Sequence, residues 1–141
     1  MIHINNVMIR TRFADVVFPV FGDRVQLQQV MLNLVMNGLE AMSSVSERTR
    51  ELVVTTRNID PGQVQITVED SGTGVDPNTI ERIFDPFYTS KAEGEGTGLG
   101  LSICHGIITE HGGKIEVKSK VNKGSCFRVI FPKPPALKQV G

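Results

Sequence analysis

The chain has 141 residues, enough for one domain with a buried core, and is 40% hydrophobic and 21% charged, as globular proteins usually are. Fifteen basic residues balance fifteen acidic ones, so no overall field would gather nucleic acid or an anionic membrane. No apolar run approaches the roughly 18 residues of a membrane span, and no secretory signal is recognised. We therefore expect a cytoplasmic protein without nucleic-acid or direct membrane contact.

The lysines and cysteines indicate no second function. Four lysines near the C-terminus could suggest a basic patch: Lys114, Lys118, Lys120 and Lys123. Three of them share the parity of one strand face, which favours a solvated face. Cys104 and Cys126 belong to no cluster with metal-ligand spacing, so we expect both to be reduced packing residues.

The first half of the chain predicts strand, helix and hairpin in that order. Residues 7–14 read as a strand, followed by a short extended piece at residues 18–21. Residues 23–42 predict the clearest helix. Its apolar side chains recur at helical spacing: Leu27, Val30, Met31, Leu34, Val35, Leu39 and Met42. Residues 52–59 and 64–69 predict two strands joined by the turn Asp60-Pro61-Gly62.

The second half predicts two helices and a final hairpin. Asp76 is a possible N-cap for a short helix that has Pro77 at its first position. Another helix would begin at Thr97 or Gly98 and end at Gly112. Residues 114–121 and 125–131 alternate as strands around the turn at residues 122–124. The order of elements predicts an α+β fold, with a mixed sheet and helices packed on one face.

One polar stripe on the first helix is not required for packing. Its members are spaced by 3, 4, 4 and 3 residues: Gln26, Gln29, Asn33, Asn37 and Glu40. The simpler interpretation is an exposed face. Asparagine is a poor helix former, however, and a pair at Asn33 and Asn37 would present two amide oxygens to one site. Mg²⁺ accepts neutral oxygen ligands together with waters and phosphate oxygens.

Asp70 ends a strand in which the even-numbered positions are apolar. It shares their parity, so its carboxylate should point to the buried side, where it needs a hydrogen-bond donor. Gly72 and Gly74 follow at once and would let backbone approach a ligand closely. The alternative is an aspartate that only caps its own turn.

A glycine loop at residues 94–101 leads into the predicted helix. It fits neither a dinucleotide fingerprint nor a P-loop, which leaves a flexible loop before a helix N-terminus, a ready anion site. The alternative is a plain linker. Just upstream, Phe84, Phe87 and Tyr88 would suit the hydrophobic anchors of a lid, although aromatic residues also simply fill cores.

The order of these motifs resembles the N, G1, F and G2 boxes of histidine kinase catalytic domains, relatives of gyrase, Hsp90 and MutL. The likeness runs from about residue 7 to residue 132. Residues 22–30 and 83–87 resemble kinases of the nitrogen- and oxygen-sensing type, and Gly124-Ser125-Cys126-Phe127 is similar to the family's closing Gly-Thr-x-Phe. The resemblance implies a two-layer α/β sandwich, the Bergerat ATP-binding fold, with about five strands and about three helices. The domain would span residues 1–132, with a tail at 133–141.

The resemblance also implies roles for single residues. Asn37 would ligate Mg²⁺ on ATP, with Asn33 beside it, and Asp70 would accept the adenine amino hydrogen. Gly72 and Gly74 would let the backbone pass the base. The lid over the phosphates would comprise Gly96, Thr97, Gly98, Leu99 and Gly100. Lys91 would contact a phosphate, and a solvated lysine is the alternative.

Asn33 bears on the choice between kinase and hydrolase. The gyrase-like branch carries a glutamate there as a base, and an amide cannot act as one. Transfer to a histidine is therefore expected. His3, His105 and His111 lack the acid and proline that follow the family's phosphorylated histidine. We expect the acceptor on a dimerisation domain preceding Met1, with a response regulator as an indirect partner. The alternatives are a serine kinase of the anti-sigma type and a nucleotide-binding module without catalysis.

Overall fold

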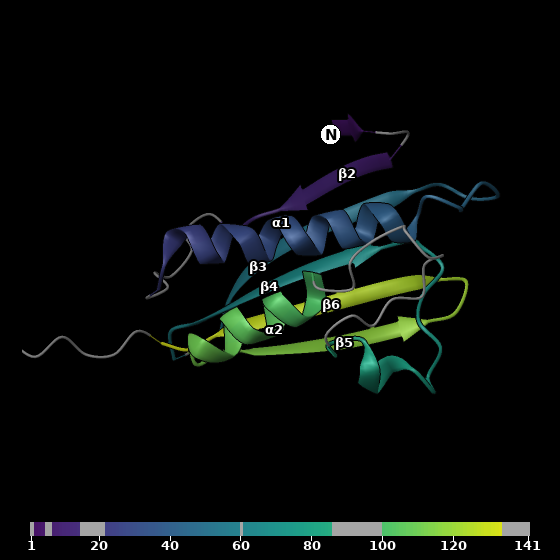
Figure 1. The fold of residues 1–141 in the computed structure, drawn as a ribbon. Helices are drawn as coiled ribbons and strands as arrows, with labels where there is room; N and C mark the ends of the chain where they lie inside the picture. The colour runs from purple at the N-terminus through teal and green to yellow at the C-terminus, as the bar shows by residue number, and fades with distance from the viewer. Residues whose placement is uncertain (1, 5–6, 15–21, 60, 86–99, 134–141) are drawn as a thin grey trace, which may run out of the picture.

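A computed structural model describes residues 2–4, 7–14, 22–59, 61–85 and 100–133. Two α-helices and six strands lie within these ranges (Figure 1). In chain order the elements are β1 (Ile2–Ile4), β2 (Val7–Arg12), α1 (Arg24–Ala41), β3 (Glu51–Ile59), β4 (Gln63–Asp70), the 3-10 helix η1 (Ile80–Arg82), α2 (Gly100–Glu110), β5 (Lys114–Lys120) and β6 (Gly124–Phe131).

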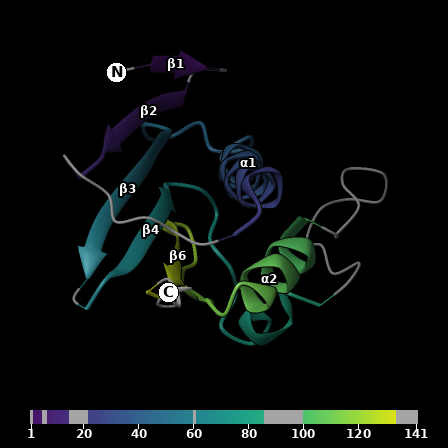
Figure 2. The same ribbon diagram turned by 90° about the vertical axis from the view of Figure 1, so that its left-hand side faces the viewer.

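The strands form one mixed sheet in the order β1-β2-β3-β4-β6-β5. Only β2 and β3 pair in parallel, and every other neighbouring pair is antiparallel. Figure 2 shows α1 and α2 together on one side of this sheet. The predicted two-layer α+β architecture is therefore confirmed. The sheet has one strand more than expected, because β1 has three residues and is too short to show alternation.

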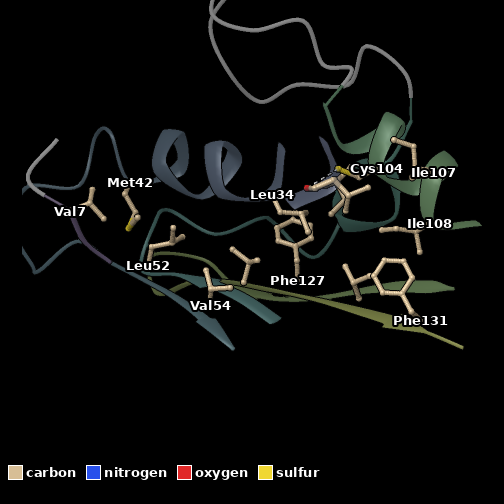
Figure 3. Packing of buried hydrophobic residues seen from close by; sticks show 14 residues of the cluster. Val7, Leu34, Met42, Leu52, Val54, Cys104, Ile107, Ile108, Phe127 and Phe131 are labelled. Atoms are coloured by element: carbon tan, nitrogen blue, oxygen red, sulfur yellow. Dashed lines mark hydrogen bonds between the residues drawn. The ribbon is translucent and has the colours of Figure 1, made fainter. Parts of the chain in front are cut away.

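The core lies between the helices and the sheet (Figure 3). Val30, Leu34 and Met42 from the helix layer are fully buried against Leu52 and Phe127 of the sheet. The other apolar positions that the helical spacing singled out pack at the edge of this core: Leu27, Met31, Val35 and Leu39. Burying these side chains supplies most of the stabilisation of the two layers, at roughly 25 cal/mol per Å² of apolar surface.

The ends of the elements follow the capping residues in the sequence. Asp23 caps α1, and its Oδ1 accepts a hydrogen bond from the Gln26 backbone N–H at 3.1 Å. Gly112 has a positive φ of 73°, which ends α2 where expected. In the β5–β6 turn, Asn122 has φ 64° and Gly124 has φ 128°, as the turn signal predicted.

The short helix predicted after Asp76 is wrong in type and position. Asp76 Oδ1 accepts from the Asn78 backbone N–H at 2.8 Å, and its carbonyl accepts from Thr79, which closes a tight turn. The chain then forms only the single 3-10 turn of η1. An aspartate side chain that bonds its own backbone competes with helix formation, and this competition explains the difference. The extended piece expected at residues 18–21 lies outside the described residues.

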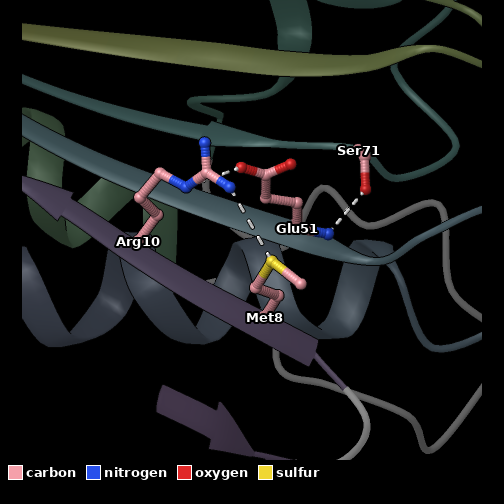
Figure 4. A network of polar contacts seen from close by, with 4 residues as sticks. All are labelled: Met8, Arg10, Glu51 and Ser71. Carbon is pink, nitrogen blue, oxygen red and sulfur yellow. Dashed lines mark hydrogen bonds and ion pairs between the residues drawn. The ribbon is translucent and has the colours of Figure 1, made fainter. Parts of the chain in front are cut away.

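The second face of the sheet is polar. Arg10 on β2 forms an ion pair with Glu51 on β3 at 3.4 Å, and it also donates to the Met8 sulfur (Figure 4). The lysines of β5, at positions 114, 118 and 120, are exposed, in agreement with the solvated face expected from their parity. Among the described residues, no helix is long and apolar enough to cross a membrane.

Candidate functional site

The candidate site begins on the face of α1 that turns towards α2. Asn33 is half-buried, and its amide nitrogen donates to the Gly100 carbonyl at the start of α2, with 3.4 Å between nitrogen and oxygen. Asn37 lies four residues further on, about one helical turn, so it shares this face and is also half-buried. The two amides are thus on one side of the helix, as their spacing predicted.

Asp70 lies at the C-terminal end of β4, beneath Gly38 of α1. Its exposed fraction is 8%, so the carboxylate points to the helix side as its strand parity predicted. A Cβ added to Gly38 of α1 would lie 2.6 Å from Leu52 Cδ1 and 3.4 Å from the Asp70 Cβ. The missing side chain at Gly38 therefore allows the helix to lie directly on the carboxylate.

Burial dominates the chemistry of Asp70. It raises the pKa of the carboxyl from 3.8 to about 6, and hydrogen bonds from the Gly72 and Ser125 backbone oppose that rise. The Gly72 N–H donates to Asp70 Oδ1 at 2.9 Å. A buried carboxylate with lone pairs to spare is an acceptor suited to an amino group on a ligand.

The loop after Asp70 lies tightly between α1 and the β5–β6 hairpin. A Cβ on Gly72 would lie 2.6 Å from the Ala41 carbonyl oxygen, which also accepts the Thr73 N–H at 3.2 Å. Gly74 has a positive φ of 74° and no room beside the Lys120 carbonyl. These close approaches require glycine at both positions, independently of any ligand.

A pair of serines supports this loop: Ser125 belongs to the closing motif, and Ser119 belongs to none of the motifs. Ser119 Oγ on β5 accepts the Val75 backbone N–H at 2.7 Å and lies 2.8 Å from Ser125 Oγ. Ser125 is 8% exposed and pairs with Asp70 across β4 and β6. The residues of β5 and β6 alternate between the two faces of the sheet, and this alternation places both serines on the core face. It is the sequence signal that could have identified them.

Phe84, one of the three aromatic residues considered as lid anchors, packs against the core, and its role in a lid stays a prediction. Its ring centroid is 5.5 Å from that of His105 on α2 and 6.4 Å from that of Phe127 on β6, with the second pair edge to face. Phe87, Tyr88 and Lys91 lie outside the described residues, and so do four lid residues: Gly96, Thr97, Gly98 and Leu99. Gly100 is the first residue of α2.

The remaining candidates have structural contacts. Cys104 is fully buried, its thiol lies 3.6 Å from the Val30 carbonyl oxygen, and burial raises the pKa of this thiol to about 11. Both cysteines are free, as expected. His111 packs at the end of α2: its Nδ1 is 2.7 Å from the Ile107 carbonyl, and its Nε2 accepts the Asp23 backbone N–H at 3.1 Å.

Comparison with known proteins identifies the family. The sequence profile of the histidine kinase-, DNA gyrase B- and HSP90-like ATPases matches residues 22–135. The chain belongs to this ATPase family. Within it, the sensor histidine kinase TmoS of Ectopseudomonas mendocina is 40% identical over 129 residues, which cover 91% of this chain and 13% of TmoS.

Solved members of the ATPase family share the fold. The catalytic domain of histidine kinase ThkA superposes with a TM-score of 0.77 at 35% identity, covering 92% of this chain and 82% of that one. Full-length ShkA in complex with AMPPNP gives a TM-score of 0.77 at 26% identity, covering 94% of this chain and 27% of that one. ThkA has also been solved in complex with the response regulator protein TrrA. The chain thus spans a small part of TmoS and most of an isolated catalytic domain.

Proposed function

We propose that this chain binds Mg-ATP and transfers the γ-phosphoryl group to a histidine on a dimerisation domain outside it. The observation that carries the proposal is the buried Asp70 carboxylate, which lies under α1 and beside the loop that contains Gly72 and Gly74. We assign residues 1–132 to the catalytic domain and residues 133–141 to a tail.

Asp70 would select the base. Its carboxylate would accept a hydrogen bond from the amino group of adenine. Guanine has a carbonyl at that position, so two hydrogen-bond acceptors, its oxygen and the carboxylate, would face each other. A site built on one buried hydrogen bond discriminates by up to roughly 10⁴-fold. Burial strengthens the preference for adenine over guanine, because water cannot reach the carboxylate to replace the missing amino group as hydrogen-bond donor.

Asn37 would hold the metal. It is a neutral oxygen donor on the face of α1 that turns towards α2, and one amide oxygen suits an ion that keeps its waters and binds phosphate oxygens. Mg²⁺ would neutralise charge on the triphosphate. The residues expected beside it are Gly96, Thr97, Gly98, Leu99 and Gly100 as the lid, and Lys91 as a phosphate contact.

Asn33 supports transfer over hydrolysis. Its amide cannot take a proton from water, and the amide nitrogen is engaged with the Gly100 carbonyl. Asn33 would thus orient the start of α2 beside the phosphates. Phosphoryl transfer depends mostly on positioning and on charge neutralisation, and this set of residues is suited to both.

One of the solved relatives supports a response regulator as a partner. ThkA binds the response regulator TrrA, and we propose a response regulator as the indirect partner of this chain, downstream of the histidine-bearing domain. A cytoplasmic location and membership of the nitrogen- and oxygen-sensing subgroup remain predictions. A serine kinase of the anti-sigma type and a non-catalytic nucleotide-binding module are the alternatives.

Calorimetric titration with ATP and ADP in the presence of Mg²⁺ tests the site. We expect Asn37→Ala to lose the metal-dependent part of the affinity and Asp70→Asn to weaken binding of both nucleotides. Unchanged affinity in both variants would refute the assignment. Adding a dimerisation domain in trans then separates the alternatives, because a non-catalytic module would bind ATP without labelling the histidine.

A further inference from the structure

A side chain outside the recognised motifs contacts the base-reading loop. Arg48 lies between α1 and β3, and its exposed guanidinium donates to two consecutive carbonyls of the loop. Its Nη2 is 2.6 Å from the Gly72 oxygen and 3.0 Å from the Ser71 oxygen, and its Nε is 3.2 Å from the Ser71 oxygen. The arginine thus binds the backbone at the start of the loop, whereas Ser119 binds it at Val75.

One peptide unit lies between Arg48 and Asp70. The carbonyl of Ser71 accepts from the guanidinium, and the N–H of Gly72, which belongs to the same amide, donates to Asp70 Oδ1 at 2.9 Å. A charge-assisted hydrogen bond at the oxygen polarises the amide and makes its N–H a stronger donor. The positive charge of Arg48 therefore reaches the carboxylate through a single amide.

The orientation of this amide does not depend on Arg48 alone. Ser71 Oγ accepts the Glu51 backbone N–H at 2.9 Å (Figure 4), and the same hydroxyl donates to the Thr49 carbonyl at 3.0 Å. The Ser71 N–H also donates to the Glu51 carbonyl at 3.2 Å. Because β3 already fixes Ser71 in place, what Arg48 adds is its charge and its hydrogen bonds.

Among the described residues no cation is a direct partner of Asp70, and Arg48 reaches it only through the Ser71–Gly72 amide. The residues facing Asp70 are Gly38 from α1, Leu52 from β3 and Ser125 from β6, and none of them is ionisable. Glu69 and Cys126 point to the opposite face of the sheet, although Asp70 still interacts electrostatically with the Cys126 thiol. Glu51 pairs with Arg10 on that face, and Glu40 is exposed on α1.

We propose that Arg48 is a positioning residue for nucleotide recognition, which acts through the Ser71–Gly72 amide to keep the Asp70 carboxylate ionised and aimed at the base. The inference rests on the proposed role of Asp70. It extends the site to the connection between α1 and β3, where no motif of the sequence indicated a function.

The test is calorimetric titration of the 141-residue chain with ADP, from acidic to neutral pH across the pKa of about 6 of Asp70. We expect Arg48→Gln to weaken ADP binding about three- to tenfold at neutral pH. The pH below which affinity falls should also move upward, because the carboxylate loses its cationic support. Arg48→Lys should recover part of both effects. Arg57→Gln, at an exposed arginine on β3, is the matched control and should behave as wild type.

Two results would overturn the inference. One is an affinity for Arg48→Gln equal to that of Arg57→Gln. The other is a loss that is uniform with pH, which would mark a purely structural contact. Asp70→Asn distinguishes the two levels of the proposal: if it weakens ADP binding while Arg48→Gln does not, only the role of Arg48 fails. If Asp70→Asn binds as wild type, the proposed function fails, and the inference fails with it.

Discussion

Gly38 of α1 packs directly on Asp70 of β4. A Cβ built at Gly38 would meet the Asp70 Cβ at 3.4 Å and the carboxylate oxygen Oδ2 at 3.8 Å. Because Gly38 has no side chain, the backbone of α1, the helix that carries Asn37, lies directly on the carboxylate. The packing of the two layers and the burial of the proposed base reader depend on the same contact.

Substitution of Gly38 by alanine should therefore destabilise the protein. The added methyl would lie 2.6 Å from Leu52 Cδ1, and overpacking of this kind costs about 1–3 kcal/mol, partly offset by about 1 kcal/mol of helix propensity. Urea unfolding should show a net loss of about 1 kcal/mol. Gly106→Ala on α2 is the control: its Cβ meets nothing within 4 Å, so stability should rise by about 0.5–1 kcal/mol. A Gly38→Ala variant as stable as Gly106→Ala would contradict the packing described.

Asp70→Asn should stabilise the protein at neutral pH while weakening nucleotide binding. The folded state raises the pKa of Asp70 from 3.8 to about 6, so it favours the neutral acid and is penalised when the group ionises. The stability contributed by the protonated acid is complete below pH 3.8 and is lost as the pH rises through about 6. The advantage of the variant should be on the order of 3 kcal/mol above that window and vanish below it. Urea unfolding at several pH values measures it, and an advantage that is constant with pH would contradict the cause given.

The two cysteines should differ in their reaction with a thiol reagent. Cys104 is fully buried and its pKa is raised to about 11, so little thiolate forms and none of it is accessible. Cys126 lies on the polar face of the sheet and is only partly buried. Burial also raises the pKa of this thiol, but more of its surface is accessible than that of Cys104. Alkylation followed by mass spectrometry should label Cys126 slowly in the native protein. Labelling of Cys104 should require unfolding, and fast native labelling of Cys104 would contradict its burial.

His111→Ala should loosen the junction of the two helices. The imidazole donates from Nδ1 to the Ile107 carbonyl and accepts the Asp23 N–H at Nε2, so its loss removes two hydrogen bonds of about 1 kcal/mol each. We expect a loss of about 1–2 kcal/mol in thermal or urea unfolding. Glu110→Ala, at the exposed neighbouring position, should change stability by less than about 0.5 kcal/mol. Equal effects of the two variants would argue against the bridge.

Periodicity predicted those parts of the fold that depend on local geometry. The apolar spacing from Leu27 to Met42 placed the buried face of α1, and strand parity placed Asp70 on the helix side. Both follow from the fixed repeat of a helix or strand. The helix after Asp76 was wrong, because an aspartate side chain serves a turn as readily as a helix start.

The contacts that complete the site join residues far apart in the chain. Arg48 contacts the loop after Asp70 at Ser71 and Gly72, and Ser119 contacts it at Val75. Strand alternation places Ser119 on the core face, but no pattern in the sequence gives the partner of either residue. A single exposed arginine is usually a solvated residue, so its position alone gave no reason to single it out. Such contacts follow only once the packing of β3, β4 and β5 is fixed.

The C-terminal half of α1 connects the two ends of the proposed ligand. Asn37 would serve the phosphates, and the carbonyl of Ala41 holds Thr73 in the base loop. These two positions lie four residues apart on one rigid rod, a separation of about 6 Å along its axis. The spacing between the proposed metal ligand and the carbonyl that holds the base loop is therefore set by the backbone hydrogen bonds of a helix. A tilt or slide of α1 would move Asn37 and the Ala41 carbonyl together, so the proposed contacts to the phosphates and to the base loop would shift as one.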